Sequence, residues 1–188
     1  MISYFGKRFV DIILSLLAII FLSPIFVLIT ICIYLFDSGP ILFSQERIGR
    51  RNSIFNLIKF RSLPIGTTNV SSDKLSEIKI TKIGKILRRT NADELPQLIN
   101  ILRGEMSIVG PRPCLLGQKE LIKLRIENKS INCRPGLTGF AQINSYDNMS
   151  FKDKAFYDYI YSNKINIFFD IFIILKTFIY LFSPPPKY

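Results

Sequence analysis

Hydrophobic residues are concentrated in two long runs, one near each end of the chain. The first extends from Ile12 to Phe36 and contains no charged side chain. A straight helix of this length would measure roughly 37 Å, whereas the hydrocarbon core of a membrane is about 30 Å thick. The run is therefore predicted to be a membrane helix that is long enough to cross a bilayer.

Two features of this run favour a bend over a straight crossing. Pro24 lies at its midpoint, where it removes a backbone donor and its ring pushes against the carbonyl of Ile20, and the hydroxyl of Ser23 is a nearby donor for that carbonyl. Positive residues, which favour the cytoplasmic side of a membrane, flank the run at both ends. We therefore expect a re-entrant helix that bends at Ser23-Pro24 and leaves by the face it entered. A spanning helix with a proline kink is the alternative.

A β-hairpin is predicted after the turn signal at Gly39-Pro40. Segments 41–50 (ILFSQERIGR) and 54–63 (IFNLIKFRSL) are short and rich in apolar residues, and Arg50-Arg51-Asn52 joins them. From Gly66 to Glu77 the composition changes to Thr, Ser, Asn and Asp, which predicts a loop.

Two amphipathic helices are predicted further along. In KITKIGKILRR, residues 79–89, basic residues at steps of three lie beside isoleucines. This pattern is typical of a helix on an anionic membrane surface, although an ordinary solvated helix shows it too. The second apolar run, from Ile165 to Phe182, carries Asn166, Asp170 and Thr177 on one side. Because a charge at the bilayer centre is costly, we expect this helix to lie half immersed in the interface.

The central stretch RRTNADELPQLINILRGEMSIVGPRP carries the candidate chemistry. Its leucines and isoleucines recur at helical spacing, Gly104 is a natural stop, and Pro96 fits only a first turn, so the helix should begin near Ala92 to Asp93. Asp93 and Glu94 would then lie at a helix N-terminus, which keeps a carboxylate ionised and favours phosphate. Asp93 could act as a nucleophile on phosphate and Glu94 could hold Mg²⁺. The alternative is that both residues merely cap the helix.

Basic residues with stiff or open surroundings accompany this pair. Two prolines flank Arg112, and a proline follows Arg134, with Gly136 and Gly139 beyond it to let backbone amides approach a ligand. Lys59 and Arg61 end the second predicted strand, and Arg88 precedes the acidic pair. These five cations are candidate phosphate ligands.

Composition narrows the chemistry further. The chain has 25 Lys and Arg against 14 Asp and Glu, a net charge of +11, which predicts a polyanionic partner. It has no histidine, which excludes histidine-based triads and nearly all zinc sites. Cys32, Cys114 and Cys133 form no C-x-x-C motif, and we expect all three to be reduced.

The stretches KFRS, ADELPQLINILRGEMSIVGPRP, RPGLTGFAQIN and DIFIILKT together resemble the bacterial sugar transferase family, the small monotopic phosphoglycosyl transferases. The resemblance covers nearly the whole chain. It implies an α+β, membrane-associated protein that is mainly helical with small β-hairpins. Residues 1–36 would form the re-entrant helix, and residues 37–188 a catalytic domain with an interfacial C-terminal helix on the cytoplasmic face of the bacterial inner membrane.

The resemblance also implies a reaction and its residues. Members transfer a phosphosugar from a UDP-sugar to polyprenyl (undecaprenyl) phosphate and release UMP, through a covalent intermediate. Asp93 matches the nucleophile and Glu94 the residue that binds Mg²⁺. Lys59, Arg88 and Arg112 match phosphate contacts, and Asp170 matches an acidic position near the site. We count Arg61, Arg134 and Gln142 among the substrate-binding residues as well.

Some questions stay open at this stage. Ser145-Tyr146 stands where many relatives have Gly-Arg, so a ligand contact of that arginine is in doubt. The family favours an N-acetylated sugar, but neither the sugar, the glycan pathway nor the oligomeric state can be read from the sequence. A glycosyltransferase that releases UDP and a non-catalytic basic lipid-binding module are the alternatives. No nucleic-acid motif is recognised, so no nucleic-acid partner is expected.

Overall fold

The computed structural model describes residues 6–37, 39–67, 80–144 and 149–181. Its elements, in chain order, are α1 (Lys7–Phe36), β1 (Leu42–Ile48), the 3₁₀ turn η1 (Arg50–Asn52), β2 (Ile54–Phe60), α2 (Lys82–Arg89), η3 (Ala92–Glu94), α3 (Gln97–Arg103), β3 (Ser107–Val109), α4 (Lys119–Glu127), η4 (Ser130–Asn132), β4 (Gly136–Thr138), α5 (Phe140–Asn144), α6 (Phe151–Asn163) and α7 (Ile167–Leu181). The described part of the chain is thus mainly helical with small sheets, as predicted. The predicted loop 66–77 falls almost entirely outside these residues.

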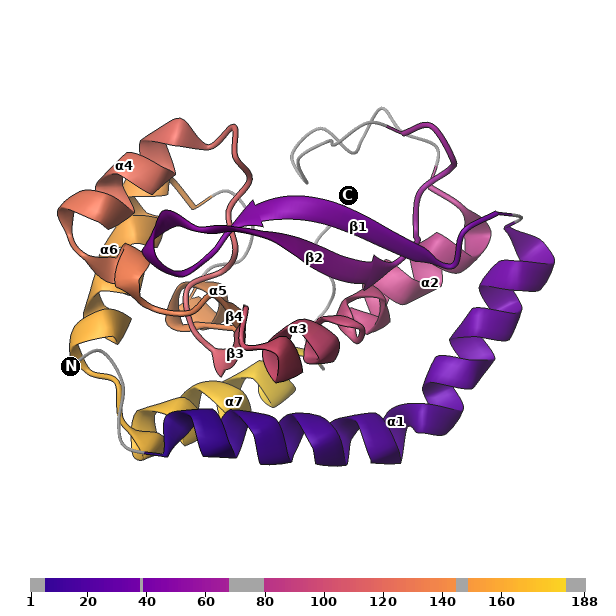
Figure 1. Cartoon of the computed structure of the whole chain (residues 1–188), viewed down its shortest axis with the longest axis horizontal. Helices are drawn as coiled ribbons and strands as arrows, with labels where there is room; N and C mark the ends of the chain where they lie inside the picture. The colour runs from indigo at the N-terminus through magenta and orange to yellow at the C-terminus, as the bar shows by residue number, and fades with distance from the viewer. Residues whose placement is uncertain (1–5, 38, 68–79, 145–148, 182–188) are drawn as a thin grey trace.

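Helix α1 contains the predicted proline bend. Pro24 lies inside one continuous helix, and Figure 1 shows the ribbon changing direction partway along its length. The hydroxyl of Ser23 donates to the carbonyl of Ile20 at 2.8 Å, which confirms the partner predicted for that carbonyl. By length and composition the helix could also cross a membrane. The re-entrant path therefore stays a prediction.

The protein-facing side of α1 is polar in its first half. Lys7, Asp11 and Ser15, spaced four apart, are buried, whereas Phe9 and Phe21 on the outer side are 68% and 77% exposed. Asp11 Oδ1 accepts hydrogen bonds from the hydroxyl of Ser107 and the amide of Ile108, both at 3.0 Å. This is the reverse of a soluble amphipathic helix, whose apolar side faces the protein.

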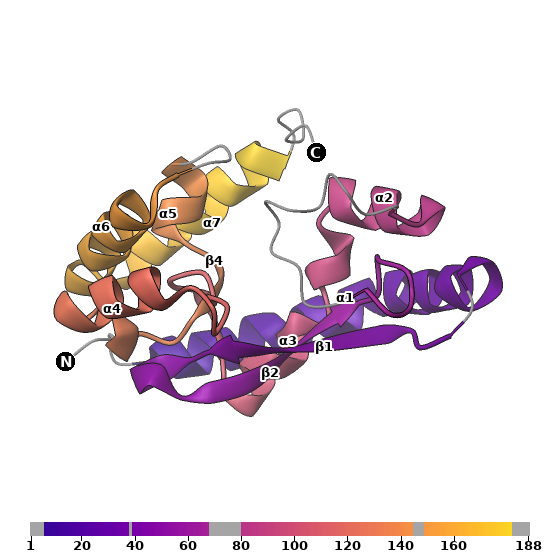
Figure 2. The same ribbon diagram turned by 90° about the horizontal axis from the view of Figure 1, so that it is seen from above.

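The hairpin and α3 form the layers above α1. Strands β1 and β2 pair antiparallel with Arg50–Asn52 at the turn, as predicted. Figure 1 shows α3 between this hairpin and α1, and Figure 2 shows α4 to α7 gathered at one end of the molecule and α2 at the other. Apolar residues from the three layers make the largest core cluster: Phe55, Leu57, Leu98, Ile101 and Met106, with Ala18, Ile19 and Phe26 of α1 against it.

The second sheet corrects two predictions. Strands β3 and β4 are parallel, so β1–β2 is the only hairpin among the described strands. The backbones cross so closely there that a Cβ added at Gly110, Gly136 or Gly139 would collide with backbone atoms of the neighbouring segment. Gly136 and Gly139 therefore allow close packing on Gly110, and the neighbour they admit is protein backbone instead of a ligand.

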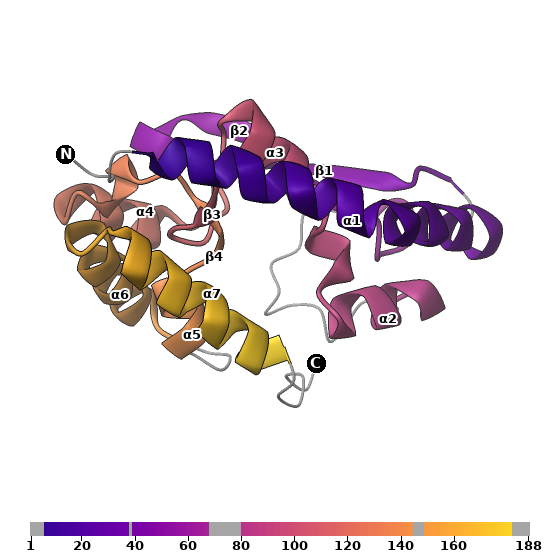
Figure 3. The same ribbon diagram turned by 90° about the horizontal axis from the view of Figure 1, so that it is seen from below.

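Helix α7 turns its polar side toward the protein. Asp170 and Ile173 are buried, and Thr177 contacts Thr138 at 2.6 Å between hydroxyl oxygens. The outward side is apolar, with Phe168 80% and Ile179 63% exposed. Figure 3 shows α7 and α1 starting close together on one side of the molecule and then diverging. The apolar sides of both helices are thus left uncovered.

Helix α2 is amphipathic as predicted, but part of its apolar side is internal. Leu87 is buried with Ile29, Ile33 and Phe60, whereas Ile86 is 61% exposed. Cys32, Cys114 and Cys133 are free in the structure, and Cys114 and Cys133 are buried.

The backbone crossing at Gly110 provides a test of the fold. Replacing Gly110 by Ala should lower the free energy of unfolding by about 2 kcal/mol, because the added Cβ would overlap the carbonyl of Arg134. Gly117→Ala is the matched control, since a Cβ there has nothing within 4 Å. Thermal unfolding of the detergent-solubilised variants measures the difference. Equal stability of the two variants would contradict the crossing.

Candidate active site

A cavity of about 260 Å³ lies between the β1–β2 hairpin, residues 61–67, the end of α2 and the turn η3. Six of the predicted site residues line it: Lys59, Arg61, Arg88, Asp93, Glu94 and Arg112. They come from four separate segments of the chain, and the fold brings these segments together around one cavity.

Asp93 and Glu94 lie in the 3₁₀ turn η3 and not at the start of a helix, which corrects the prediction. Helix α3 begins only at Gln97, with Pro96 as its N-cap residue. The amides of Glu94 and Leu95 donate to carbonyls three residues earlier, at 3.1 and 3.3 Å. Pro96 has no amide hydrogen to donate, so the helical pattern starts after it. Glu94 is therefore held by neighbouring cations and not by a helix terminus.

Glu94 shares one carboxylate oxygen between two cations. Its Oε1 lies 2.6 Å from Lys59 Nζ and 2.8 Å from Arg112 Nη2. Burial alone would raise the pKa of Glu94, but the charges of Arg112 and Lys59 and their hydrogen bonds outweigh it and hold the pKa well below its ordinary value. Glu94 is therefore ionised at neutral pH and fixes both cations in the cavity.

Asp93 has the opposite electrostatic character. Its side chain is buried, and burial raises its pKa, against the attraction of Lys59. The neighbouring charge of Glu94 raises the pKa further. Asp93 is thus a poorly solvated carboxylate of increased basicity, next to a permanently ionised one, and increased basicity favours nucleophilic attack.

Arg88 and Arg61 line the cavity and also hydrogen-bond to other parts of the protein. Arg88 Nε donates to the hydroxyl of Ser62 at 2.9 Å. Arg61 Nη2 donates to the carbonyl of Asp37 at 2.7 Å, at the C-terminal end of α1. Both side chains are therefore oriented by the protein before any ligand arrives.

Arg47 lines the cavity and was not predicted. Its Nη2 donates to Gln45 Oε1 at 2.6 Å and its Nη1 to the carbonyl of Pro113 at 3.3 Å. Burial and the neighbouring charge of Arg112 lower its pKa to about 10. The alternation of side chains along a strand could have identified Arg47 as a site residue. Phe43, Gln45 and Arg47 lie on one face of β1, and Phe43 pairs with the predicted site residue Lys59.

Three predicted residues lie outside the cavity lining. Arg134 Nε donates to the carbonyl of Gly104 at 3.0 Å, and Gln142 Nε2 donates to the carbonyl of Leu137 at 3.2 Å. Asp170 is buried between helices. Ser145-Tyr146 falls outside the described residues.

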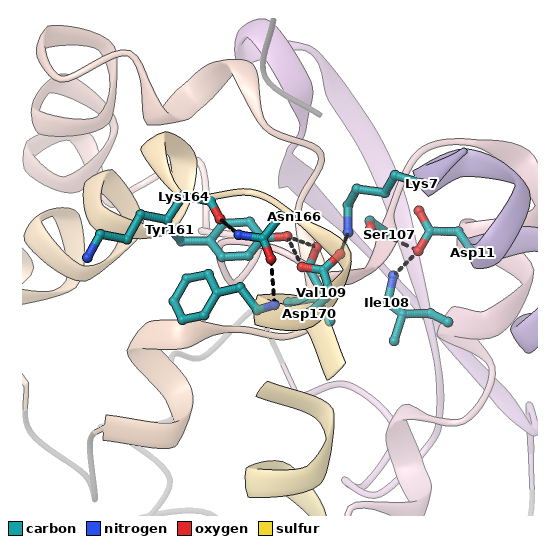
Figure 4. Close-up of polar contacts among 10 residues, drawn as sticks. Lys7, Asp11, Ser107, Ile108, Val109, Tyr161, Lys164, Asn166 and Asp170 are labelled. Atoms are coloured by element: carbon teal, nitrogen blue, oxygen red, sulfur yellow. Dashed lines mark hydrogen bonds and ion pairs between the residues drawn. The ribbon is translucent and has the colours of Figure 1, made fainter. Parts of the chain in front are cut away.

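The surroundings of Asp170 are drawn in Figure 4. Its Oδ2 lies 2.5 Å from Lys7 Nζ of α1, and its Oδ1 accepts from the hydroxyl of Tyr161 at 2.8 Å. That hydroxyl also lies 2.9 Å from the carbonyl of Val109, so it shares its proton between two acceptors. Burial, followed by the charge of Asp170, raises the pKa of Tyr161. These contacts give Asp170 a structural role that joins α1, α6, β3 and α7.

A divalent cation would find few protein ligands here. No group of three or more metal-ligating side chains gathers within the part of the chain that the structure describes. The carboxylates of Asp93 and Glu94 are hard oxygen donors, and Mg²⁺ is commonly held by one or two carboxylates together with substrate phosphates and water. The donor set therefore fits Mg²⁺ that arrives with a phosphorylated ligand.

Comparison with known proteins gives matches over nearly the whole chain. The sequence model of the bacterial sugar transferase family matches residues 2–184. The exopolysaccharide production protein ExoY of Sinorhizobium fredii is 34% identical over 189 residues, which cover 92% of this chain and 83% of the relative. The UDP-glucose:undecaprenyl-phosphate glucose-1-phosphate transferase of Escherichia coli is 36% identical over 180 residues, covering 91% and 39%.

A sugar transferase of Haemophilus influenzae, described as uncharacterized, is 33% identical over 188 residues, covering 91% of this chain and 40% of the relative. The chain thus spans about two fifths of the length of the Escherichia coli and Haemophilus influenzae proteins.

The raised pKa of Asp93 predicts a change in stability. The ionised carboxyl destabilises the fold once the pH exceeds its ordinary value of 3.8, so Asp93→Asn should raise the free energy of unfolding at neutral pH. The advantage of the variant should grow as the pH rises through the raised folded-state pKa and then level off. Chemical denaturation over a pH series measures it. A variant less stable than the wild type at neutral pH would contradict the assignment.

Proposed function

The chain belongs to the bacterial sugar transferase family, and from this premise we propose that it transfers a phosphosugar from a UDP-sugar to undecaprenyl phosphate. The products would be undecaprenyl-diphosphate-sugar and UMP, and the reaction would begin the membrane stage of glycan assembly. The name of the Escherichia coli relative supports the donor and acceptor classes. By family resemblance we propose an N-acetylated sugar.

The observation that carries the proposal is the charge balance of the cavity. Five cations line it, Arg47, Lys59, Arg61, Arg88 and Arg112, against the two carboxylates of Asp93 and Glu94. Such an excess of oriented positive charge suits a diphosphate, and bidentate guanidinium groups match phosphate oxygens. A carboxylate buried among them would face the phosphorus of a bound diphosphate.

We propose two half-reactions at Asp93. In the first, a carboxylate oxygen of Asp93 attacks the β-phosphorus of the UDP-sugar, and the bond from that phosphorus to the bridging oxygen breaks, so UMP leaves with the electron pair. In the second, a phosphate oxygen of the lipid attacks the same phosphorus, and the bond to Asp93 breaks to regenerate its carboxylate. Lys59 and Arg112, both held by Glu94, would screen the repulsion between the anions.

Glu94 would hold Mg²⁺ together with the substrate phosphates. When bound, the ion would neutralise charge on the phosphate oxygens. The protein side chains have their own tasks: Glu94 orients two cations, and Arg88, held by Ser62, presents positive charge to a ligand.

The uncovered apolar sides of α1 and α7 support a place at the membrane. The acceptor phosphate stays at the membrane surface, so a cavity that serves it must lie there too. We propose that α1 is re-entrant, that α7 lies in the interface, and that the cavity opens on the cytoplasmic face of the inner membrane. The exposed outer residues of both helices and the positive residues flanking α1 support this arrangement.

The nucleotide product tests the reaction. Purified protein with undecaprenyl phosphate, Mg²⁺ and a panel of UDP-sugars should release UMP, and Asp93→Asn should reduce release by about a thousandfold or more, because the nucleophile is lost. Chelation of divalent cations should stop release by the wild type. Asp153→Asn, an exposed carboxylate of α6 outside the cavity lining, is the control with full activity expected.

Other products would contradict the proposal. Release of UDP would indicate a glycosyltransferase that moves the sugar alone. Full activity of Asp93→Asn would exclude the assigned nucleophile.

The membrane path is tested by labelling single cysteines at either end of α1. In a background without Cys32, Cys114 and Cys133, Ser3→Cys and Ser38→Cys should react with a membrane-impermeant maleimide from the same, cytoplasmic side. Pro24→Ala should shift molecules toward opposite sidedness, because it restores the missing backbone donor and removes the clash. Opposite sidedness with Pro24 present would instead indicate a spanning helix.

A further inference from the structure

The segment that carries Arg112 is fixed through its carbonyl groups. Pro111 and Pro113 have no amide hydrogen, so the segment can make few backbone hydrogen bonds as a donor. Its three successive carbonyls all accept instead. Pro111 O accepts from the amide of Gly136 at 2.9 Å, Arg112 O from Arg125 Nη1 at 2.9 Å, and Pro113 O from Arg47 Nη1 at 3.3 Å.

Arg125 is itself held by a buried ion pair. Its Nε and Nη2 lie 2.8 and 2.7 Å from Oδ2 of Asp158, which joins α4 to α6. The two side chains are only 6% and 2% exposed. A buried pair of this kind is seldom more stabilising than well-packed apolar residues, because both charges lose their hydration. The same guanidinium also donates to Arg112 O, so the ion pair fixes a group that contacts the segment of Arg112.

The side chain of Arg112 needs such support. It is 49% exposed, and within the cavity its Nη2 lies 2.8 Å from Glu94 Oε1. A long, half-exposed side chain has many accessible rotamers. The position of its guanidinium therefore depends on the position and orientation of the backbone at Arg112. Of the three groups that hold this segment, Arg125 is the one that contacts the backbone of Arg112 itself, and it does not line the cavity.

We propose that Arg125, fixed by Asp158, is a positioning residue that places Arg112 for its contact with phosphate. The proposal rests on the function proposed above. It describes a chain of contacts from Asp158 through Arg125 and the carbonyl of Arg112 to Glu94. Arg125 touches no substrate and acts only through Arg112.

Arg125→Lys keeps the charge beside Asp158 but loses the planar fork that reaches both Asp158 and the carbonyl. We expect kcat/KM for UMP release to fall by about ten- to hundredfold, since small misplacements of binding groups have effects of this size. A loss of packing alone would instead lower the amount of folded enzyme and leave the KM of the folded fraction unchanged.

A double-mutant cycle separates positioning from general structure. In an Arg112→Ala background, Arg125 has no guanidinium left to place, so Arg125→Lys should change activity by less than about twofold. The same fold-loss in both backgrounds would overturn the proposal. Asn128→Ala is the matched control, because Asn128 also joins α4 to α6, by a 2.8 Å hydrogen bond to the carbonyl of Ala155, without contacting Arg112. It should lower stability but leave kcat/KM unchanged.

A second variant covers the case in which Arg125→Lys does not fold. Replacing the pair together, Arg125→Met with Asp158→Leu, removes both charges at similar volume, a change that buried pairs often tolerate. This variant should fold and show the same loss of activity. Wild-type activity in it would overturn the proposal.

Binding of inorganic pyrophosphate, measured by calorimetry, gives a readout that does not depend on the sugar or the lipid. Arg125→Lys should weaken pyrophosphate binding when Arg112 is present and have no effect in Arg112→Ala. If no UDP-sugar yields UMP but this coupling is found, the proposed function fails and the positioning role stands. If UMP is released but the coupling is missing, the positioning role fails alone.

Discussion

The ion pair between Lys7 and Asp170 is the contact on which the arrangement of the molecule depends. It lies buried at the start of α1 and joins that helix to α7, while the hydroxyl of Tyr161 ties Asp170 to the carbonyl of Val109 in β3. Because Lys7, Asp11 and Ser15 turn inward, the first half of α1 meets the protein through polar groups and leaves its apolar side outside. That apolar side is not covered by protein and is left in contact with the surrounding medium.

The cavity is organised by charge. Positive side chains from several segments converge there, and Glu94 is the acidic residue that holds two of them in place. Asp93 forms no such ion pair with any residue that the structure describes, and its burial raises its pKa. Two adjacent carboxylates are thus given different electrostatic character by their surroundings: Glu94 is a fixed counter-charge, and Asp93 is a poorly solvated group with a raised pKa.

Much of this could be read from the sequence, for identifiable reasons. The Ser23 contact and the β1–β2 hairpin depend on neighbours in the sequence, and local rules predict such features well. Strands β3 and β4 have only three residues each, which is too short for a periodic signal. The start of α3 was placed too early, because Pro96 was expected within a first helical turn, whereas residues 92–94 form a separate 3₁₀ turn and Pro96 is the N-cap residue of α3. Arg134 was nominated by its proline and glycine neighbours and Asp170 by the family resemblance, and neither signal contains their contacts across the fold with Gly104 and Lys7. Gln142 donates to the carbonyl of Leu137, five residues away.

The contact of Arg61 with Asp37 has a mechanical consequence. Arg61 lines the cavity, and its guanidinium also donates a hydrogen bond to the carbonyl of Asp37, the C-cap residue of α1. This hydrogen bond joins the C-terminal arm of the bent helix directly to the wall of the cavity. A change in the tilt of this arm would therefore also move the guanidinium of Arg61, and with it one wall of the cavity.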